Sequence, residues 1–196
     1  MIVWEINSKN LETIAKKAAL ALQKGEIVAC PTDTVYGLIA DAANKKAVKR
    51  VLLIKGRKET KPLPIFVKNI SMAKHFAKVS PLQERFLRKV WPGKVTAVLE
   101  SRGILPKETG TQESIGLRIP NYTLVHLMLG KVRRPLTGTS ANLSGTPSLS
   151  DSKELIAKFQ RRKYKPDIVL DAGVLRKSKP SKVVDIRGAK YKVIRK

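Results

Sequence analysis

The stretch IVACPTDTVYGL, residues 27–38, decides how this chain folds. Its first four residues are apolar and predict a short buried strand, which Pro31 closes. The polar residues that follow therefore lie in a loop at a strand end, a preferred place for ligand sites in α/β sheets. Thr32 and Thr34 stand two residues apart, so in extended backbone they offer two hydroxyls on one face. Loop hydroxyls also commonly bond only to nearby backbone groups, and that simpler reading stays open.

Helices and strands are predicted to alternate on both sides of this stretch. Apolar residues at helical spacing predict a helix over residues 11–22, stopped by Gly25. Other helices are predicted after the caps Asn44, Ser80 and Asn121, and over 151–160. Strands are predicted at 63–67, 95–99, 115–119, 168–170, 183–186 and 191–194, the last two as a hairpin. This alternation without repeats indicates one domain, 1–196, of the α/β (α+β) class with a mixed sheet.

The charge of the chain is strongly basic. Forty Lys and Arg against 15 Asp and Glu give a formal net charge of +25 at pH 7. Such an excess attracts polyanions, which could be tRNA, another nucleic acid or an acidic protein, or it reflects only a general basic bias. The densest run, 158–165, holds five cations and two aromatics. It can contact an RNA backbone or simply anchor a helix end to the core.

Several protein classes are excluded by composition. Cys30 is the only cysteine, which rules out an internal disulfide and fits a reducing compartment. With only His75 and His126 beside it, a zinc-type cluster is not expected. No apolar stretch approaches the roughly 18 residues that a membrane helix needs, and Glu5 interrupts the apolar start of the chain. The sequence therefore predicts a cytoplasmic protein without membrane contact.

Two short motifs each place polar side chains two residues apart. They are Lys55-Gly56-Arg57 and Ser140-Ala141-Asn142. Lys with Arg suits the phosphates of a nucleotide, because Arg grips two oxygens and Lys is a compact charge. A hydroxyl with an amide can orient such a ligand. Each motif alone is also typical of ordinary surface or turn structure. Because the chain has neither a P-loop nor a dinucleotide fingerprint, side chains would have to bind the phosphates.

Six motifs follow one another along the chain: PTDTVYGL (31–38), IKGR (54–57), WPG (91–93), LRIP (117–120), TSANLSG (139–145) and PSKVVD (180–185). In order and spacing this series resembles the YrdC-type threonylcarbamoyl-AMP synthase family, over nearly the whole chain. The resemblance implies an open, twisted mixed sheet with flanking helices and a concave basic face. It also implies that the extra C-terminal domain of longer members is absent.

The resemblance implies an ATP-dependent enzyme. It would join L-threonine, bicarbonate and ATP into L-threonylcarbamoyladenylate and release pyrophosphate, with Mg²⁺ carried on the ATP phosphates. A separate tRNA-threonylcarbamoyl transferase machinery would then modify an adenosine beside the tRNA anticodon, and weak tRNA binding is expected. One alternative is a noncatalytic double-stranded RNA or tRNA-binding module on the same fold, which the net charge supports. Another is a carbamoyl-adenylate-forming domain of the hydrogenase-maturation type, against which the lack of zinc-finger or acylphosphatase-like segments argues.

The resemblance also implies roles for particular residues. The expected catalytic residues are Lys55, Arg57, Ser140 and Asn142. The expected ATP-binding residues are Arg57, Lys61, Ser140, Asn142, Ser148 and Arg195. The expected threonine-binding residues are Thr34, Arg118 and Ser181. Structural or supporting roles are expected for Asp33, Asp41 and Asp185. Departures from the usual family pattern occur at Lys61, Phe66 and Lys182.

Overall fold

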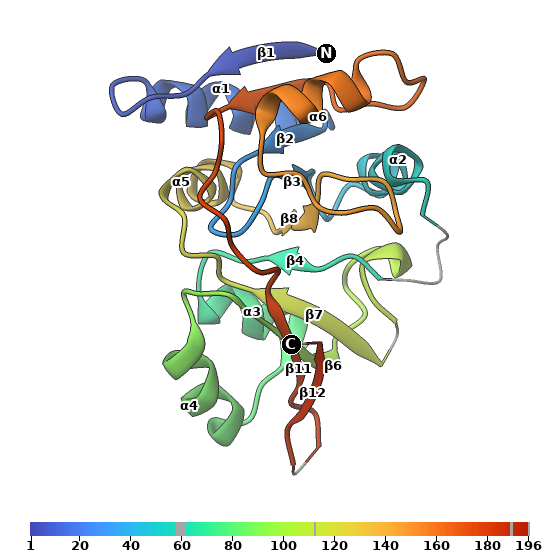
Figure 1. Ribbon diagram of the computed structural model, residues 1–196. Coiled ribbons are helices and arrows are strands. Elements are labelled where there is room, and N and C mark those ends of the chain that lie inside the picture. The colour runs from blue at the N-terminus through green and yellow to red at the C-terminus, as the bar shows by residue number, and fades with distance from the viewer. Residues whose placement is uncertain (58–61, 112, 189, 196) are drawn as a thin grey trace.

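The computed structural model describes residues 1–57, 62–111, 113–188 and 190–195. Two hydrogen-bonded sheets follow each other across the molecule, with helices on both sides (Figure 1). The helices are α1 (Leu11–Gln23), α2 (Lys45–Lys55), α3 (Ile70–Phe76), α4 (Pro81–Val90), α5 (Thr123–Val132) and α6 (Ser152–Phe159), with a 3-10 turn η1 at Lys107–Thr109. Within these described ranges, no helix is long and apolar enough to cross a bilayer.

The first sheet has the strand order β1-β10-β2-β3-β9. Its strands are β1 (Ile2–Glu5), β2 (Val28–Cys30), β3 (Gly37–Ile39), β9 (Thr139–Ser140) and β10 (Ile168–Asp171). Strand β10 runs parallel to both β1 and β2, whereas β3 is antiparallel to β2 and to β9. The loop 31–36 thus leaves β2 and returns in β3, and the pairing of Gly37 with Ser140 brings the second polar motif beside it.

The second sheet has the order β12-β11-β6-β7-β4-β8, and β5 pairs with β6. Its strands are β4 (Ile65–Phe66), β5 (Ala77–Lys78), β6 (Val95–Ser101), β7 (Ser114–Arg118), β8 (Leu136–Thr137), β11 (Lys182–Asp185) and β12 (Lys192–Arg195). A bridge between Asp41 and Leu136 links the end of β3 to β8. The predicted α/β class with mixed strand pairing is therefore confirmed, and the strands are divided between two sheets. The predicted hairpin of β11 and β12 is also confirmed.

Strand geometry divides the core of the first sheet into two sides. Val28 and Cys30 face one hydrophobic cluster, with α1 and α5, whereas Ala29 faces another, with α2 and α6. This alternation follows from the two-residue period of a strand, and it explains why the predicted strand is apolar throughout. A third cluster joins α3 and α4 to the second sheet.

Most helix starts follow the predicted caps. The side chain of Asn44 accepts a hydrogen bond from the backbone of Ala47, and Gly56 ends α2 in the left-handed conformation, with φ 58°. Ser80 and Gln83 form the predicted capping box of α4.

The predicted cap at Asn121 is wrong. Helix α5 begins at Thr123 and has Tyr122 at its N-cap, without a side-chain cap bond. The backbone N–H of Asn121 donates to Asp33 Oδ2 at 3.0 Å, which links the segment after β7 to the polar loop 31–36. The helix also continues past the predicted end at Gly130 to Val132, since Gly130 makes a helix less stable without stopping it.

Candidate active site

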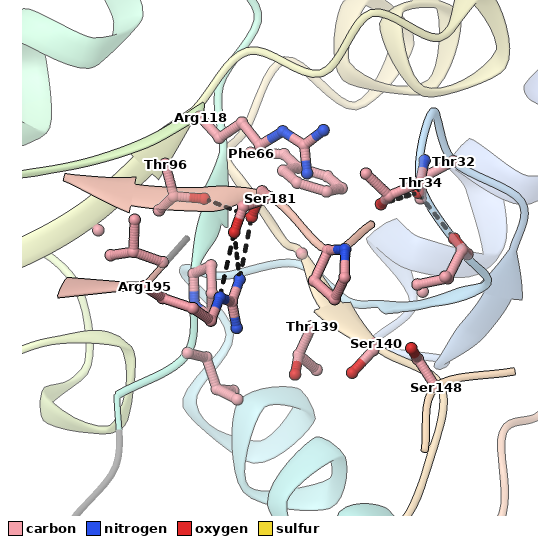
Figure 2. A pocket seen from close by; sticks show the side chains of 18 of the residues that line it. Thr32, Thr34, Phe66, Thr96, Arg118, Thr139, Ser140, Ser148, Ser181 and Arg195 are labelled. Atoms are coloured by element: carbon pink, nitrogen blue, oxygen red, sulfur yellow. Dashed lines mark hydrogen bonds between the residues drawn. The ribbon is translucent and has the colours of Figure 1, made fainter. Parts of the chain in front are cut away.

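A cavity of about 680 Å³ opens between the two sheets, within the size range of small-molecule sites. Its walls come from the loop 31–36, β9 and the loop after it on one side, and from the second sheet on the other (Figure 2). Most of the predicted site residues line it, although they are far apart in sequence. These residues are Thr34, Arg57, Arg118, Ser140, Asn142, Ser148, Ser181 and Arg195. Lys61, also predicted to bind ATP, lies outside the described residues.

The cavity is electropositive. The guanidinium groups of Arg57, Arg118 and Arg195 line it, and no carboxylate occurs among its described lining residues. Burial lowers the pKa of Arg57 and of Arg118, and the nearby charge of Arg195 lowers both further because like charges repel. Arg57 also has a buried Nε without a hydrogen-bond partner among the described residues. A multiply charged anion would relieve this repulsion.

Arg118 is held in place by groups behind the cavity wall. Its Nη2 donates to both oxygens of Asp33, at 2.7 and 2.8 Å, and its Nε donates to the carbonyl of Gly93 at 2.8 Å. The ion pair is buried, and Asp33 opposes the fall in the pKa of Arg118. Figure 2 shows the guanidinium above the ring of Phe66, with 5.8 Å between its carbon and the ring centroid. Nη1 has no partner among the described residues and can bind a carboxylate.

Two pairs of hydroxyls lie on facing sides of the cavity (Figure 2). Thr32 and Thr34 are hydrogen-bonded at 3.0 Å, and so are Thr96 and Ser181. Arg195 donates to the carbonyl of Ser181 at 2.7 Å and to its hydroxyl at 3.2 Å, which ties β12 to this pair. The arrangement can recognise a ligand that carries a hydroxyl or an ammonium group together with a carboxylate.

Lys55 lies beneath the cavity and is not among its lining residues. Its ammonium group donates to the carbonyl of Ser140 at 2.6 Å, to the carbonyl of Asn142 at 3.0 Å and to Asn142 Oδ1 at 3.1 Å. Burial, and then the charge of Arg57, lower the pKa of Lys55 to about 8. The two polar motifs of the sequence are therefore bonded to each other through Lys55.

The side chain of Asn142 forms hydrogen bonds to Lys55 and to groups of its own loop. Its Oδ1 accepts from the hydroxyl of Ser140 as well as from Lys55, and its amide nitrogen donates to the carbonyls of Leu143 and Thr146. Every hydrogen-bonding position of an Asn amide then has a partner within the chain. Asn142 therefore fixes the conformation of this loop. The Ser140 side chain lies at the surface of the loop (Figure 2).

Comparison with known proteins shows the family of this chain. A family model named for Sua5, YciO and YrdC and described as Telomere recombination matches residues 20–196. The putative threonylcarbamoyl-AMP synthase of Methanocaldococcus jannaschii is 34% identical over 98% of this chain and 90% of its own length. This chain belongs to the Sua5/YciO/YrdC family.

Other members of the Sua5/YciO/YrdC family are longer. The threonylcarbamoyl-AMP synthase of Pyrococcus abyssi is 32% identical over 94% of this chain but only 54% of its own length. The structure of P. abyssi Sua5 complexed with L-threonine superposes with a TM-score of 0.91 at 29% identity, and the match covers all of this chain and 57% of that one. The predicted family and enzyme class are thus confirmed by relatives that carry the name threonylcarbamoyl-AMP synthase.

The predicted site residues did not include every residue of the cavity. Thr96, Thr139 and the floor residue Phe66 line it as well. Thr96 and Val98 of β6 face the cavity and alternate with Ala97, which is in the core, so a polar residue in an otherwise apolar strand was the available signal. Phe66 was named only as a departure from the family pattern and not as a site residue, because an aromatic residue in a short strand is ordinary core.

Gly138 lies against Phe66 on the floor of the cavity, and its replacement gives a testable prediction. A Cβ at Gly138 would lie 2.3 Å from Cε1 of Phe66, so Gly138→Ala must displace the ring that supports Arg118. We expect this overpacking to lower the free energy of unfolding by about 1–3 kcal/mol, measured by urea titration. Gly116→Ala is the matched control, because its Cβ would meet only Thr96 Cγ2, at 3.4 Å. Equal stability of the two variants would show that the ring can move without cost.

Proposed function

We propose that this cavity joins L-threonine, bicarbonate and ATP into L-threonylcarbamoyladenylate and releases pyrophosphate. The observation that carries the proposal is the meeting of three guanidinium groups and two hydroxyl pairs in one cavity whose described lining has no carboxylate. The likeness to a Sua5 structure that contains L-threonine supports threonine as the amino acid.

The reaction begins with two anionic partners, and this makes electrostatics the main requirement. The amine of threonine attacks the carbon of bicarbonate, and loss of water leaves a carbamate. A carbamate oxygen then attacks the α-phosphorus of ATP, the bond from that phosphorus to the bridging oxygen breaks, and the electron pair leaves with pyrophosphate. Fixed cations screen the repulsion between carbamate and triphosphate and stabilise the charge that spreads in the transition state. This route needs no covalent bond to the protein.

The amino acid is assigned to the part of the cavity around Arg118. The free Nη1 of Arg118 would bind the carboxylate, since charge-assisted bonds to a guanidinium are the strong ones. Thr34 and Ser181 would receive the ammonium and hydroxyl groups, because each belongs to a hydroxyl pair that already fixes its direction.

The nucleotide is assigned to the other groups. Arg57 and Arg195 would hold phosphate oxygens, and Ser140 and Ser148 would contact the nucleotide. Lys55 and Asn142 would act mainly by shaping the loop that presents Ser140. Mg²⁺ would arrive on the ATP phosphates, and the ATP contact of Lys61 stays a prediction.

The wider biological setting also remains a prediction. It comprises the transferase machinery, weak tRNA contact and a cytoplasmic location. A purely RNA-binding module is less well supported, because contact with a phosphate backbone needs cations but no enclosed hydroxyl pairs.

A substrate comparison tests the proposed function. We expect ATP- and bicarbonate-dependent pyrophosphate release to be at least about a hundredfold faster in kcat/KM with threonine than with valine. Valine is nearly isosteric with threonine but lacks the hydroxyl, so it would leave Thr34 or Ser181 with an unmet hydrogen bond. Equal rates with the two amino acids would contradict the hydroxyl-lined amino-acid site. If no amino acid supports pyrophosphate release, the proposed function is wrong.

A further inference from the structure

A cationic segment, residues 176–181, crosses from the first sheet to the second; we call it the strap. In Figure 1 the chain between β10 and β11 runs along the front of the molecule past both sheets. The residues that flank the strap are fixed by backbone hydrogen bonds: Leu175 donates to the carbonyl of Ser150 at 2.7 Å, and Lys182 donates to that of Lys94 at 2.9 Å. The strap therefore has a fixed position between the two sheets.

A second cavity of about 500 Å³ lies against the strap. It is lined by Val35, Ser148, Ser150, Lys177, Ser178, Lys179 and Pro180. Three of these residues, Val35, Ser148 and Pro180, also line the main cavity. The two spaces thus meet at Ser148, the residue expected to contact the nucleotide.

The chemistry of the second cavity suits an anion. Three serines and two lysines line it, and its described lining has no carboxylate. The sequence has no Asp or Glu between Asp171 and Asp185. In the part of the chain that the structure describes, no ion pair reaches Lys177 or Lys179. The Ser178 hydroxyl donates to the carbonyl of Lys179, which leaves the two ammonium groups and the hydroxyls of Ser148 and Ser150 as the donors that a compact polyphosphate requires.

We infer that this second cavity receives the pyrophosphate leaving group and forms its exit from the enzyme. The inference rests on the proposed function, in which the carbamate attacks from the side of Arg118. Pyrophosphate released by this attack must leave the main cavity, and the second cavity joins the main cavity at Ser148, a residue assigned to the nucleotide. A nucleotide held at the junction by Ser148 can direct this departing group into the cavity beside Lys177 and Lys179.

The test replaces the two strap lysines and measures inorganic pyrophosphate directly. Lys177→Ala/Lys179→Ala should raise the product-inhibition constant of pyrophosphate about tenfold and leave the threonine KM unchanged. Titration calorimetry of pyrophosphate with the free protein should show the same loss, and orthophosphate should bind weakly to both forms. The matched control is Lys46→Ala/Lys49→Ala, which removes the same charge from exposed positions of α2.

The outcomes separate the inference from the proposed function. Wild-type turnover with an unchanged inhibition constant in the strap variant would overturn the exit and leave the function standing. Calorimetric pyrophosphate binding that depends on Lys177 and Lys179, without any threonine-dependent turnover, would keep the anion site and overturn the function. An equal loss in the Lys46 and Lys49 control would attribute the effect to net charge and overturn the exit. Weaker tRNA binding with normal pyrophosphate inhibition would make the strap a nucleic-acid contact.

Discussion

Replacing Lys55 by methionine is expected to reduce threonine-dependent pyrophosphate release by about a hundredfold, equivalent to roughly 2.7 kcal/mol of transition-state stabilisation. The ammonium group supplies donors to two carbonyls and one amide oxygen of the 140–142 loop. A methionine of similar length leaves all three acceptors without these donors in a buried place, and each such loss costs about 1–3 kcal/mol. The loop should then lose the geometry that presents Ser140 to the nucleotide. Steady-state kinetics, with circular dichroism to verify the fold, measures the effect.

The pH dependence of the wild type separates this positioning role from simple stability. Because the pKa of Lys55 is lowered to about 8, one of its three donors is lost as the pH rises through that value, and turnover should decline. Stability should change in the opposite direction. Between pH 8 and the ordinary lysine value of 10.5, the unfolded chain binds the proton more tightly, so the contribution of Lys55 to the free energy of unfolding rises with pH.

Measurements of turnover and of stability at both ends of this pH range distinguish the positioning role of Lys55 from its effect on stability. We expect kcat to fall above pH 8. Over the same pH range, Lys55 should not lower the urea midpoint of unfolding. Lys55→Arg, which keeps its proton throughout, should lack the decline in kcat if it retains activity. A constant kcat from pH 7 to 9.5 in the wild type would show that the loop does not need the third donor.

The sequence predicted the frame of this site because the signals were local. The apolar strand before Pro31, the cap at Asn44 and the box at Ser80 each act within one turn or one strand, and all three occur in the structure. The two polar motifs were also recognisable, since residues two apart in extended backbone share a direction. Local rules therefore account for where the motif residues leave their helices and strands.

The partners of those residues depend on contacts between distant segments and were harder to predict. The motif of Lys55 predicts a phosphate ligand. In the structure its ammonium group instead donates to the carbonyls of Ser140 and Asn142, which are 85 and 87 residues away in sequence. Asn121 carries a strong cap signal, but its backbone N–H donates to Asp33 and the helix begins at Thr123 with Tyr122 at its N-cap. In both cases a charged side chain, that of Lys55 or of Asp33, takes partners from a distant segment, because leaving it unsatisfied costs more than a local preference gains.

Variants of the buried ion pair of Asp33 and Arg118 should show the second large effect. Their activity and their free energy of unfolding should change by different amounts. Asp33→Ala leaves a buried guanidinium without its carboxylate and should lower the free energy of unfolding by about 3–5 kcal/mol. It should also raise the threonine KM and leave the ATP KM unchanged, because the partners of Asp33 are Arg118 and the backbone of Asn121, neither of which is assigned to the nucleotide. Arg118→Met should cut kcat/KM for threonine by about a hundredfold, the cost of a lost charge-assisted bond to the carboxylate.

The double variant Asp33→Ala/Arg118→Met distinguishes the two roles. Removing both charges avoids an unpaired ion in a buried place, so its free energy of unfolding should be closer to that of the wild type than that of Asp33→Ala. Its activity with threonine should nevertheless stay as low as that of Arg118→Met, because the donor for the carboxylate is still missing. Urea unfolding and kinetics on the same preparations give both quantities. If the double variant regained threonine turnover together with stability, Arg118 would be a structural partner of Asp33 and the carboxylate would bind elsewhere in the cavity.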